Sequence, residues 1–396
     1  MEGVFEDDKS VVKMRVLITY TTDGQIAIIK GLAQSLLEGG IDVLVWNRTT
    51  NKCFSSNDEL FKDNLSFFNN VRRIPRHVLR VLYHLPCFLT LLVNKGLYRI
   101  DVFNFHFHEG LCDRMIPHLK RRNISLIISI WGSDLYRISE KIRAKRQSVY
   151  KNVDLIHVES PGVRKDFLAK YDIDPSKVVN CNFGVELFND IDVYRGNKEL
   201  IKKQLLPEDA SDRIIITCGY NARKGQQHSV IIQQLKELPT EYKKRVFVVF
   251  PLTYTVSYDS FLDEIDDCLK DLDIPFCCFK SQLSIDDLAK LRILSDVVIN
   301  IQVTDALSSS LIEYFYAANI MLLGDWLPYQ FLKEDYGMRY IPITCSTITD
   351  AICQTIDNIE DERIAAIANV KKTHKLASWD EVAPRFVEMF NSVNRK

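Results

Sequence analysis

The chain has 396 residues and a formal net charge of −1, with 46% hydrophobic and 26% charged residues. This length exceeds what one hydrophobic core usually serves, so we expect two domains of an ordinary globular protein. The near-zero net charge excludes a global basic field of the kind that drives nucleic-acid binding, so we expect no nucleic-acid partner.

The amino terminus and the cysteines indicate the compartment. Residues 1–14 (MEGVFEDDKSVVKM) are acidic and lack the hydrophobic segment of a signal peptide. No uncharged apolar run reaches the roughly 20 residues that span a membrane. The ten cysteines are scattered and form no CxxC pair, which favours reduced thiols. We therefore expect a cytoplasmic protein.

The first half of the chain predicts a parallel sheet. A buried strand at 14–21 is followed by a turn at Asp23-Gly24, an amphipathic helix at 26–40 and a second strand at 41–46. This β-α-β order is typical of parallel α/β domains. Further strands are expected at 101–107, 125–131, 154–160 and 178–186.

A second series of alternating strands and helices follows a polar stretch around residues 188–200. Its strands are expected at 213–219, 245–252, 276–280, 296–302 and 320–325. We predict an α/β fold with two Rossmann-like doubly wound domains, 1–190 and 191–375, facing a central cleft. Ligands bind beyond the carboxyl ends of strands in such sheets. Residues 376–396 predict an amphipathic helix that packs back on the first domain.

The stretch TDALSSSLIEYFYAANI (304–320) follows the strand at 296–302 and begins a helix near Ser308–Ser310. Amides in the first turn of a helix lack internal partners and bind phosphate. Three small serines would let a diphosphate approach them, and Glu313 would accept hydrogen bonds from a ribose. Asp305 precedes the turn. The alternative is an N-cap with a capping-box-like acid, and the stretch alone supports both equally.

The stretch CGYNARKGQQH (218–228) follows the first strand of the second domain. Gly219 permits a tight turn, and Arg223 and Lys224 project where they would meet anionic groups. A solvated basic turn is the alternative. Both stretches follow strands of one expected sheet, and this favours the functional interpretation.

Together the two stretches resemble the nucleotide-sugar half of GT-B-fold glycosyltransferases, in particular the large retaining family 4 group. That group carries an acid, seven residues and a glutamate, which Asp305 and Glu313 match with aspartate in place of the usual glutamate. Lys224-Gly225 matches its Lys-Gly pair. Tyr220 stands where the group has an arginine, and Arg223 would take that role.

The resemblance implies a role for each residue. Glu313 would hold the ribose of the donor, and Asp305 would lie near its sugar; both are catalytic candidates. The remaining donor-binding candidates would contact the diphosphate: Gly219, Arg223, Lys224, Ser308, Ser309, Ser310 and Leu311.

Motifs of the first half extend the resemblance, which spans roughly residues 14–380. The segment 182–186 (NFGVE) is similar to the Gly-Val-Asp segment that ends the first domain in this group. The segment 130–137 (IWGSDLYR) resembles its His-Gly-Ser-Asp motif, with Trp131 in place of histidine. Trp-Gly-Ala-Asp versions and segments like 250–255 (FPLTYT) occur in bacterial polysaccharide enzymes, which implies a glycan acceptor. The acceptor-side candidates are Gly24, His108, Trp131 and Asp134.

His106 and His108 alternate along a strand, so only one can face a given side. A metal site would need more ligands, and Glu109 is the only nearby acid. We prefer structural roles; the alternative puts His106 in the catalytic set and His108 on the acceptor side. Asp271–Asp273 has the letters of a metal-binding Asp-x-Asp motif but the context of a solvated helix end. We expect no metal and no cofactor beyond the nucleotide diphosphate sugar.

The leading hypothesis is a retaining, metal-independent glycosyltransferase that moves a sugar to a glycan or lipid-linked glycan acceptor in surface polysaccharide synthesis, such as capsule or lipopolysaccharide. A sugar-nucleotide epimerase of the same fold and a non-catalytic nucleotide-sugar-binding protein are the alternatives. The segment 71–100 mixes arginines with bulky apolar residues. It suggests either peripheral contact with the inner face of a membrane or, as we prefer, core helices with a basic outer face.

Overall fold

The computed structural model describes residues 14–21, 25–47, 52–55, 100–253 and 259–394. It divides into two compact units. The first comprises the described residues up to Val158, Leu168–Cys181 and the chain from Ala383 on, and the second comprises Glu159–Phe167 and Asn182–Val382. The expected turn residue Gly24 and positions 71–99 of the basic apolar segment lie outside the described residues.

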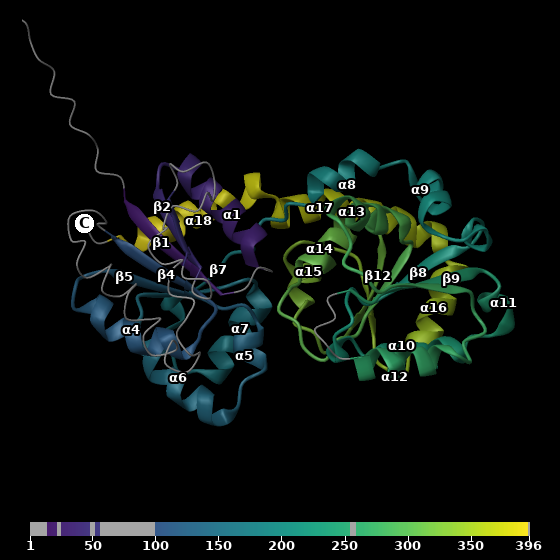
Figure 1. Cartoon of the computed structure of the whole chain (residues 1–396), viewed down its shortest axis with the longest axis horizontal. Helices are drawn as coiled ribbons and strands as arrows, with labels where there is room; N and C mark the ends of the chain where they lie inside the picture. The colour runs from purple at the N-terminus through teal and green to yellow at the C-terminus, as the bar shows by residue number, and fades with distance from the viewer. Residues whose placement is uncertain (1–13, 22–24, 48–51, 56–99, 254–258, 395–396) are drawn as a thin grey trace, which may run out of the picture. The chain divides into compact units, whose positions relative to one another are not determined.

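The first unit contains a seven-stranded sheet in the order β3-β2-β1-β4-β5-β6-β7 (Figure 1). All neighbouring strands are parallel except β2 and β3. The strands are β1 (Arg15–Tyr20), β2 (Asp42–Asn47), β3 (Lys52–Ser55), β4 (Val102–His106), β5 (Ser125–Ser129), β6 (Leu155–Val158) and β7 (Val178–Asn180). Every residue of β4 and β5 is buried, as expected for a parallel sheet covered by helices on both faces.

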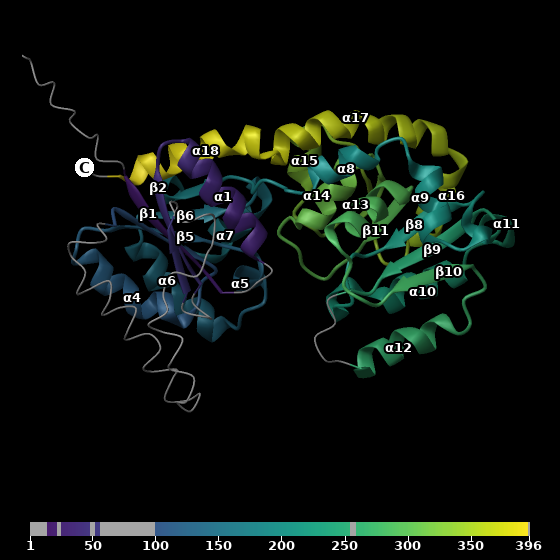
Figure 2. The ribbon, with the colours of Figure 1, turned by 45° about the horizontal axis from the view of Figure 1, so that its top comes forward.

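Helices α1 and α18 lie on one face of this sheet, and α4 and α6 lie on the other (Figures 1 and 2). The helices of this part of the chain are α1 (Ile26–Glu38), α4 (Gly110–Lys120), α5 (Ser133–Tyr136), α6 (Glu140–Asn152), α7 (Pro161–Lys170) and α18 (Trp379–Val393). Helix α7 up to Phe167 and α18 up to Val382 are assigned to the second unit. Helix α18 buries the apolar stripe expected from its sequence: Val382, Phe386, Met389 and Phe390. The ring of Phe386 meets that of His157 edge-on at 5.2 Å, and Ser125 Oγ donates to the Val393 carbonyl at 2.6 Å.

The second unit contains a six-stranded parallel sheet in the order β10-β9-β8-β11-β12-β13. Its strands are β8 (Ile214–Cys218), β9 (Val246–Pro251), β10 (Phe276–Phe279), β11 (Val297–Asn300), β12 (Ile320–Gly324) and β13 (Ile341–Ile343). Strands β8 and β11 are neighbours, but the chain leaves β8 toward β9 on one side and returns at β11 on the other. Their carboxyl ends therefore flank the topological switch point, where ligands of such sheets bind.

Two apolar clusters cover the two faces of the second sheet. Helices α10, α12 and α16 lie on one face, and α8, α13, α14 and α17 lie on the other (Figure 1). The helices are α8 (Phe188–Tyr194), α9 (Lys198–Leu205), α10 (His228–Lys236), α11 (Thr240–Lys243), α12 (Asp259–Leu269), α13 (Ile285–Leu294), α14 (Ser309–Tyr316), α15 (Gln330–Glu334), α16 (Ile348–Asp357) and α17 (Ile359–Ala377).

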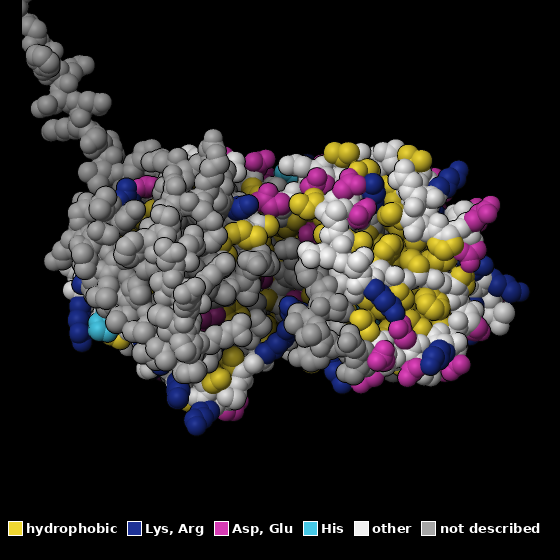
Figure 3. All heavy atoms as spheres, in the orientation of Figure 1, with side chains coloured by type: hydrophobic (Ala, Val, Ile, Leu, Met, Phe, Trp, Pro, Cys, Tyr) yellow, Lys and Arg dark blue, Asp and Glu magenta, His cyan; other side chains and the backbone are white. Residues whose placement is uncertain are grey.

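The predicted α/β class with two Rossmann-like domains is confirmed, and each expected strand is present. Strands β3 and β13 were not predicted. None of the helices among the described residues is both long and apolar enough to cross a membrane. On the face of the second unit shown in Figure 3, basic and acidic side chains are interspersed, so this face shows no extended basic patch.

Candidate functional site

Hydrogen bonds join the two loops that follow β8 and β11. Val303 N donates to the Gly225 carbonyl at 2.9 Å, and Gln226 Nε2 donates to Gln302 Oε1 at 3.0 Å. The two stretches singled out in the sequence therefore form one surface at the carboxyl edge of the second sheet. This is the edge where the switch point places a ligand.

Tyr220 lies between these loops. Its hydroxyl accepts a hydrogen bond from Gln302 Nε2 at 2.7 Å, and its amide donates to Gln226 Oε1 at 3.3 Å. Burial, and then the charge of Asp305, raise the pKa of the Tyr220 phenol above its ordinary value. Trp326 Nε1 donates to the Gln302 carbonyl at 3.0 Å and adds the loop after β12. Tyr220 is therefore a neutral, fixed wall of the site.

Gly219 is required by the turn after β8. Its φ is +66°, a conformation that side chains rarely adopt. A Cβ atom there would lie 2.8 Å from Gln226 Oε1 and 2.9 Å from His228 Cε1. The turn thus brings its backbone against the glutamine that links the two loops.

Ser308 caps α14, as the N-cap interpretation expected. Its Oγ accepts from the Leu311 amide at 3.4 Å, and its carbonyl accepts from the same amide at 3.0 Å. The Leu311 amide, which we had expected to face the diphosphate, is therefore engaged within the protein. The amides of Ser309 and Ser310 have no hydrogen-bond partner among the described residues. Two donors thus remain for an anion at this helix end.

Asp305 fastens the loop before α14. Its Oδ2 accepts from the Ser308 amide at 3.2 Å and from the Tyr329 hydroxyl. Burial raises the pKa of this carboxyl above its ordinary value, while these hydrogen bonds lower it. Asp305 thus lies beside Ser308. It is also near enough to the Tyr220 phenol for its charge to raise the pKa of that phenol.

Glu313 is not part of a capping box. Its Oε2 accepts two hydrogen bonds from the guanidinium of Arg292, a residue of α13 that the sequence analysis did not single out. The available sequence signal was an arginine within the apolar run LRIL at the end of α13. A charge in such a run needs a partner.

Arg223 and Lys224 are exposed at the rim of the same edge. The Arg223 amide donates to Asn221 Oδ1 at 3.0 Å, which fixes the backbone of the turn. Lys224 Nζ lies 4.0 Å from the Glu264 carboxylate, and both side chains are well exposed. A surface pair of this kind contributes little, so the lysine remains available to an incoming anion.

In the first unit, Asp134 holds together the turns that follow β4 and β5. Its Oδ1 accepts from the Trp131 amide at 2.8 Å, and its Oδ2 accepts from the His108 amide at 2.9 Å. Burial raises the pKa of Asp134 to about 6, although the two amides lower it. Gly132 has a φ of +81°, which makes the turn between Trp131 and Asp134.

The two histidines each have a partner that orients the ring. His106 Nδ1 accepts from Trp131 Nε1 at 3.2 Å, so in the neutral ring the hydrogen is on Nε2. His108 Nε2 lies 2.8 Å from Asp113 Oδ1. Both rings are fully buried, which fits the structural interpretation of these residues. Among the described residues, no group of three or more His, Cys, Asp or Glu side chains is placed to hold a metal ion.

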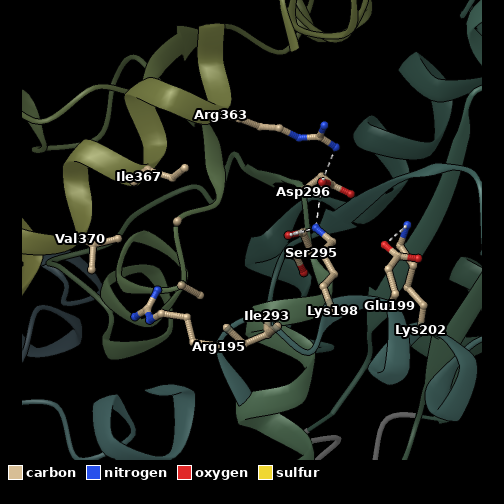
Figure 4. A pocket seen from close by; sticks show the side chains of 13 residues that line it. Arg195, Lys198, Glu199, Lys202, Ile293, Ser295, Asp296, Arg363, Ile367 and Val370 are labelled. Carbon is tan, nitrogen blue, oxygen red and sulfur yellow. Dashed lines mark hydrogen bonds and ion pairs between the residues drawn. The ribbon is translucent and has the colours of Figure 1, made fainter. Parts of the chain in front are cut away.

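A cavity of about 620 Å³ lies at the opposite, amino edge of the second sheet (Figure 4). Asp296, at the start of β11, accepts from Lys198 at 2.8 Å and from Arg363 at 3.0 Å. These charged groups satisfy one another, and no predicted site residue lines this cavity.

No protein-family model and no curated protein sequence matches this chain. Solved structures do match it along nearly its whole length. HepE of Anabaena, solved with UDP and glucose, has 11% identity and a TM-score of 0.70, covering 96% of this chain and 100% of its own. A glycosyltransferase of Rickettsia africae has 14% identity and a TM-score of 0.72, covering 97% and 100%.

Sucrose-phosphate synthase of Thermosynechococcus elongatus has 14% identity and a TM-score of 0.71, covering 96% of this chain and 99% of its own. At such identities the likeness shows the fold and leaves the activity to be argued from the site. The chain has the GT-B fold of these proteins.

Proposed function

We propose that the protein is a glycosyltransferase that uses a nucleotide diphosphate sugar bound at the carboxyl edge of the second sheet. The observation that carries this proposal is the pair of amides of Ser309 and Ser310, which lack partners among the described residues at the start of α14. They lie in the surface that the Gly225–Val303 bond closes, at the switch point of the sheet. The complexes of HepE with UDP and with UDP-glucose make UDP-glucose the first donor to test, with UDP as the matching leaving group for binding experiments.

In the proposed reaction the bond between the anomeric carbon and the diphosphate breaks, and a bond from that carbon to an acceptor hydroxyl oxygen forms. The two amides and the dipole of α14 would stabilise the charge that develops on the leaving diphosphate. Arg223 and Lys224 would add charge-assisted hydrogen bonds. The acceptor proton would go to a leaving phosphate oxygen, and the anomeric configuration would be retained. No metal ion is assigned a part.

Two regions define the rest of the proposal. Asp305 would contact the donor sugar, and Glu313 would contact the ribose. The edge of the first sheet at Trp131 and Asp134 would face the acceptor, a glycan or lipid-linked glycan of a surface polysaccharide. We place the reaction in the cytoplasm, with peripheral membrane contact if the acceptor is lipid-linked.

The test is donor-dependent gain of mass by a glycan acceptor, measured for wild type, Glu313→Ala and Glu362→Ala. Glu362 is a control for removing a half-buried glutamate, because it also pairs with an arginine and its side chain is 14% exposed, against 13% for Glu313. Its arginine is 53% exposed whereas Arg292 is 2% exposed, so thermal unfolding must show that both variants are folded. We expect Glu313→Ala to lower kcat/KM by roughly 100-fold or more. This fold-change corresponds to a loss of about 3 kcal/mol, which is what hydrogen bonds to a charged group contribute. Glu362→Ala should stay within a few-fold of wild type.

Wild-type transfer by Glu313→Ala would contradict the proposal. Conversion of the donor without any gain of mass would indicate an epimerase, and binding without conversion would indicate a non-catalytic protein. Loss of activity in EDTA, restored by a divalent cation, would refute the metal-independent mechanism.

A further inference from the structure

Arg292 is a buried cation in the apolar layer between α13 and α14. Its side chain is 2% exposed, and its guanidinium carbon lies 4.1 Å from the centroid of the Tyr314 ring. A buried guanidinium is costly unless its donors are satisfied. The hydrogen-bond partners of its Nε and Nη2 are residues of α14, the helix whose start carries the unpartnered amides.

The geometry at Glu313 makes its two carboxylate oxygens unequal. Arg292 Nε and Nη2 donate to the same oxygen, Oε2, at 3.0 and 2.9 Å. These two bonds use the lone pairs of Oε2. Oε1 has no hydrogen-bond partner among the described residues. Glu313 therefore presents one fixed, charged acceptor.

The same guanidinium also orients Ser310. Arg292 Nη2 lies 3.3 Å from Ser310 Oγ, and a guanidinium can only donate. The hydroxyl hydrogen of Ser310 must therefore point away from Arg292. It is left to serve as a donor beside the unpartnered Ser310 amide.

We propose that Arg292 is a positioning residue that makes the site selective for ribonucleotides. It holds Glu313 so that Oε1 accepts the ribose hydroxyls, and it turns the Ser310 hydroxyl toward the diphosphate. The proposal rests on the proposed function and deepens it, because it assigns the discrimination between ribose and deoxyribose to one ion pair. Arginine is suited to this task because its fork sets direction, whereas lysine supplies a point charge.

The experiment measures Kd for UDP, 2′-deoxy-UDP and 2′,3′-dideoxy-UDP by calorimetry in wild type, Arg292→Met and Arg292→Lys. Arg363→Met is the control, since it also breaks an ion pair, but at the amino edge of the sheet (Figure 4). Wild type and Arg363→Met should prefer UDP over the dideoxy form by roughly 10- to 100-fold. Arg292→Met should lower this preference to about threefold or less, and Arg292→Lys should be intermediate. Thermal unfolding of each variant verifies that it is folded.

A wild-type preference in folded Arg292→Met would overturn the inference and leave the proposed function intact, because Arg292 would then be a structural residue only. If Arg292→Met does not fold, an unchanged preference in Arg292→Lys overturns it equally. Failure of wild type to bind UDP, and also GDP when GDP is titrated in the same way, would instead refute the proposed function. Equal binding of UDP and dideoxy-UDP by wild type would refute the ribose contact of Glu313, and the inference with it.

Discussion

Gly219 matters for two reasons: its backbone has a positive φ, and a side chain there would collide with Gln226, which links the two site loops. In Gly219→Ala the new methyl would meet Gln226 Oε1 at 2.8 Å, and this oxygen also receives the Tyr220 amide. Moving Gln226 aside would break its bond to Gln302 as well. We expect Gly219→Ala to lose about 2–4 kcal/mol of unfolding free energy and at least roughly tenfold in UDP affinity.

Gly196→Ala separates the two causes of this loss. Gly196 also has a positive φ, +87°, but a Cβ there would meet nothing within 4 Å. Gly196→Ala should lower the unfolding free energy by only about 1–2 kcal/mol, the cost of a positive φ for a residue with a side chain, and it should bind UDP like wild type. Urea unfolding and calorimetry measure the two effects, and equal losses in the two variants would contradict the steric argument.

His157 links pH to the stability of the first unit. Its ring is fully buried, and Nε2 donates to the Cys181 carbonyl at 2.8 Å. Burial lowers the pKa of His157 to about 4, from about 6.5 in an unfolded chain. Between pH 6.5 and pH 4, this histidine is protonated in the unfolded chain but stays neutral in the folded protein. The unfolding free energy should therefore fall by about 3 kcal/mol as the pH drops from 6.5 to 4.

His157→Gln keeps a donor for Cys181 but cannot titrate. The stability difference between wild type and this variant should shrink by about 3 kcal/mol between pH 7 and pH 4. His118→Gln, at an exposed position of α4, controls for the chemical change. A constant difference across this pH range in urea titrations would contradict the assignment.

At the scale of the element, two adjacent helices carry the same kind of cap. Ser308 accepts from the Leu311 amide at the start of α14, and Ser284 accepts from the Asp287 amide at the start of α13. Ser308→Ala and Ser284→Ala should each lower the unfolding free energy by about 1 kcal/mol. Only Ser308→Ala should weaken UDP binding, by roughly fivefold, because it loosens the helix end that carries the proposed anion site.

The comparison of Kd values between these two caps is the informative measurement. If both variants bind UDP like wild type, α14 does not hold the diphosphate. If Ser284→Ala weakens binding as much as Ser308→Ala, the loss reflects general destabilisation instead.

Most strands were predictable because parallel strands buried on both faces are short continuous apolar runs, as in VVIN of β11. Strands β3 and β13 were missed for physical reasons. β3 is the antiparallel edge strand of the first sheet and has only four residues, too few for an alternation of polar and apolar side chains to be recognised. β13 has three residues, and Pro342 at its centre argues against a strand.

The site was predictable where its signal was local. The N-cap at Ser308 and the turn at Gly219 follow from neighbouring residues, and the structure places both as expected. The bonds from Arg292 to Glu313 and from Gln302 to Tyr220 cross 21 and 82 positions of the chain. Such contacts depend on helix packing and strand order, which a single sequence does not encode in any short pattern.

At the scale of the whole molecule, each unit has its own sheet and core, so each should respond to its own mutations. Phe386, from the last helix, is fully buried in the first unit, and Phe247 of β9 is buried in the second. Phe386→Ala should cost about 3–5 kcal/mol. We expect it to lower hydrogen-exchange protection in β5 and β6 while β8, β11 and UDP affinity keep wild-type behaviour.

Phe247→Ala should lower hydrogen-exchange protection in β8 and β11 and weaken UDP binding, while protection in β5 and β6 should stay as in wild type. Hydrogen exchange with mass spectrometry resolves the peptides of the two sheets. Equal loss of protection throughout the chain in both variants would show one cooperative unit and contradict this division.

The central claim is that a diphosphate binds the start of α14, and the position of UDP in a crystal of the complex tests it most directly. We expect phosphate oxygens about 2.7–3.2 Å from the amides of Ser309 and Ser310, with Glu313 Oε1 against the ribose. Density for UDP away from the carboxyl edge of the second sheet, with those two amides bonded only to the protein or to water, would contradict it.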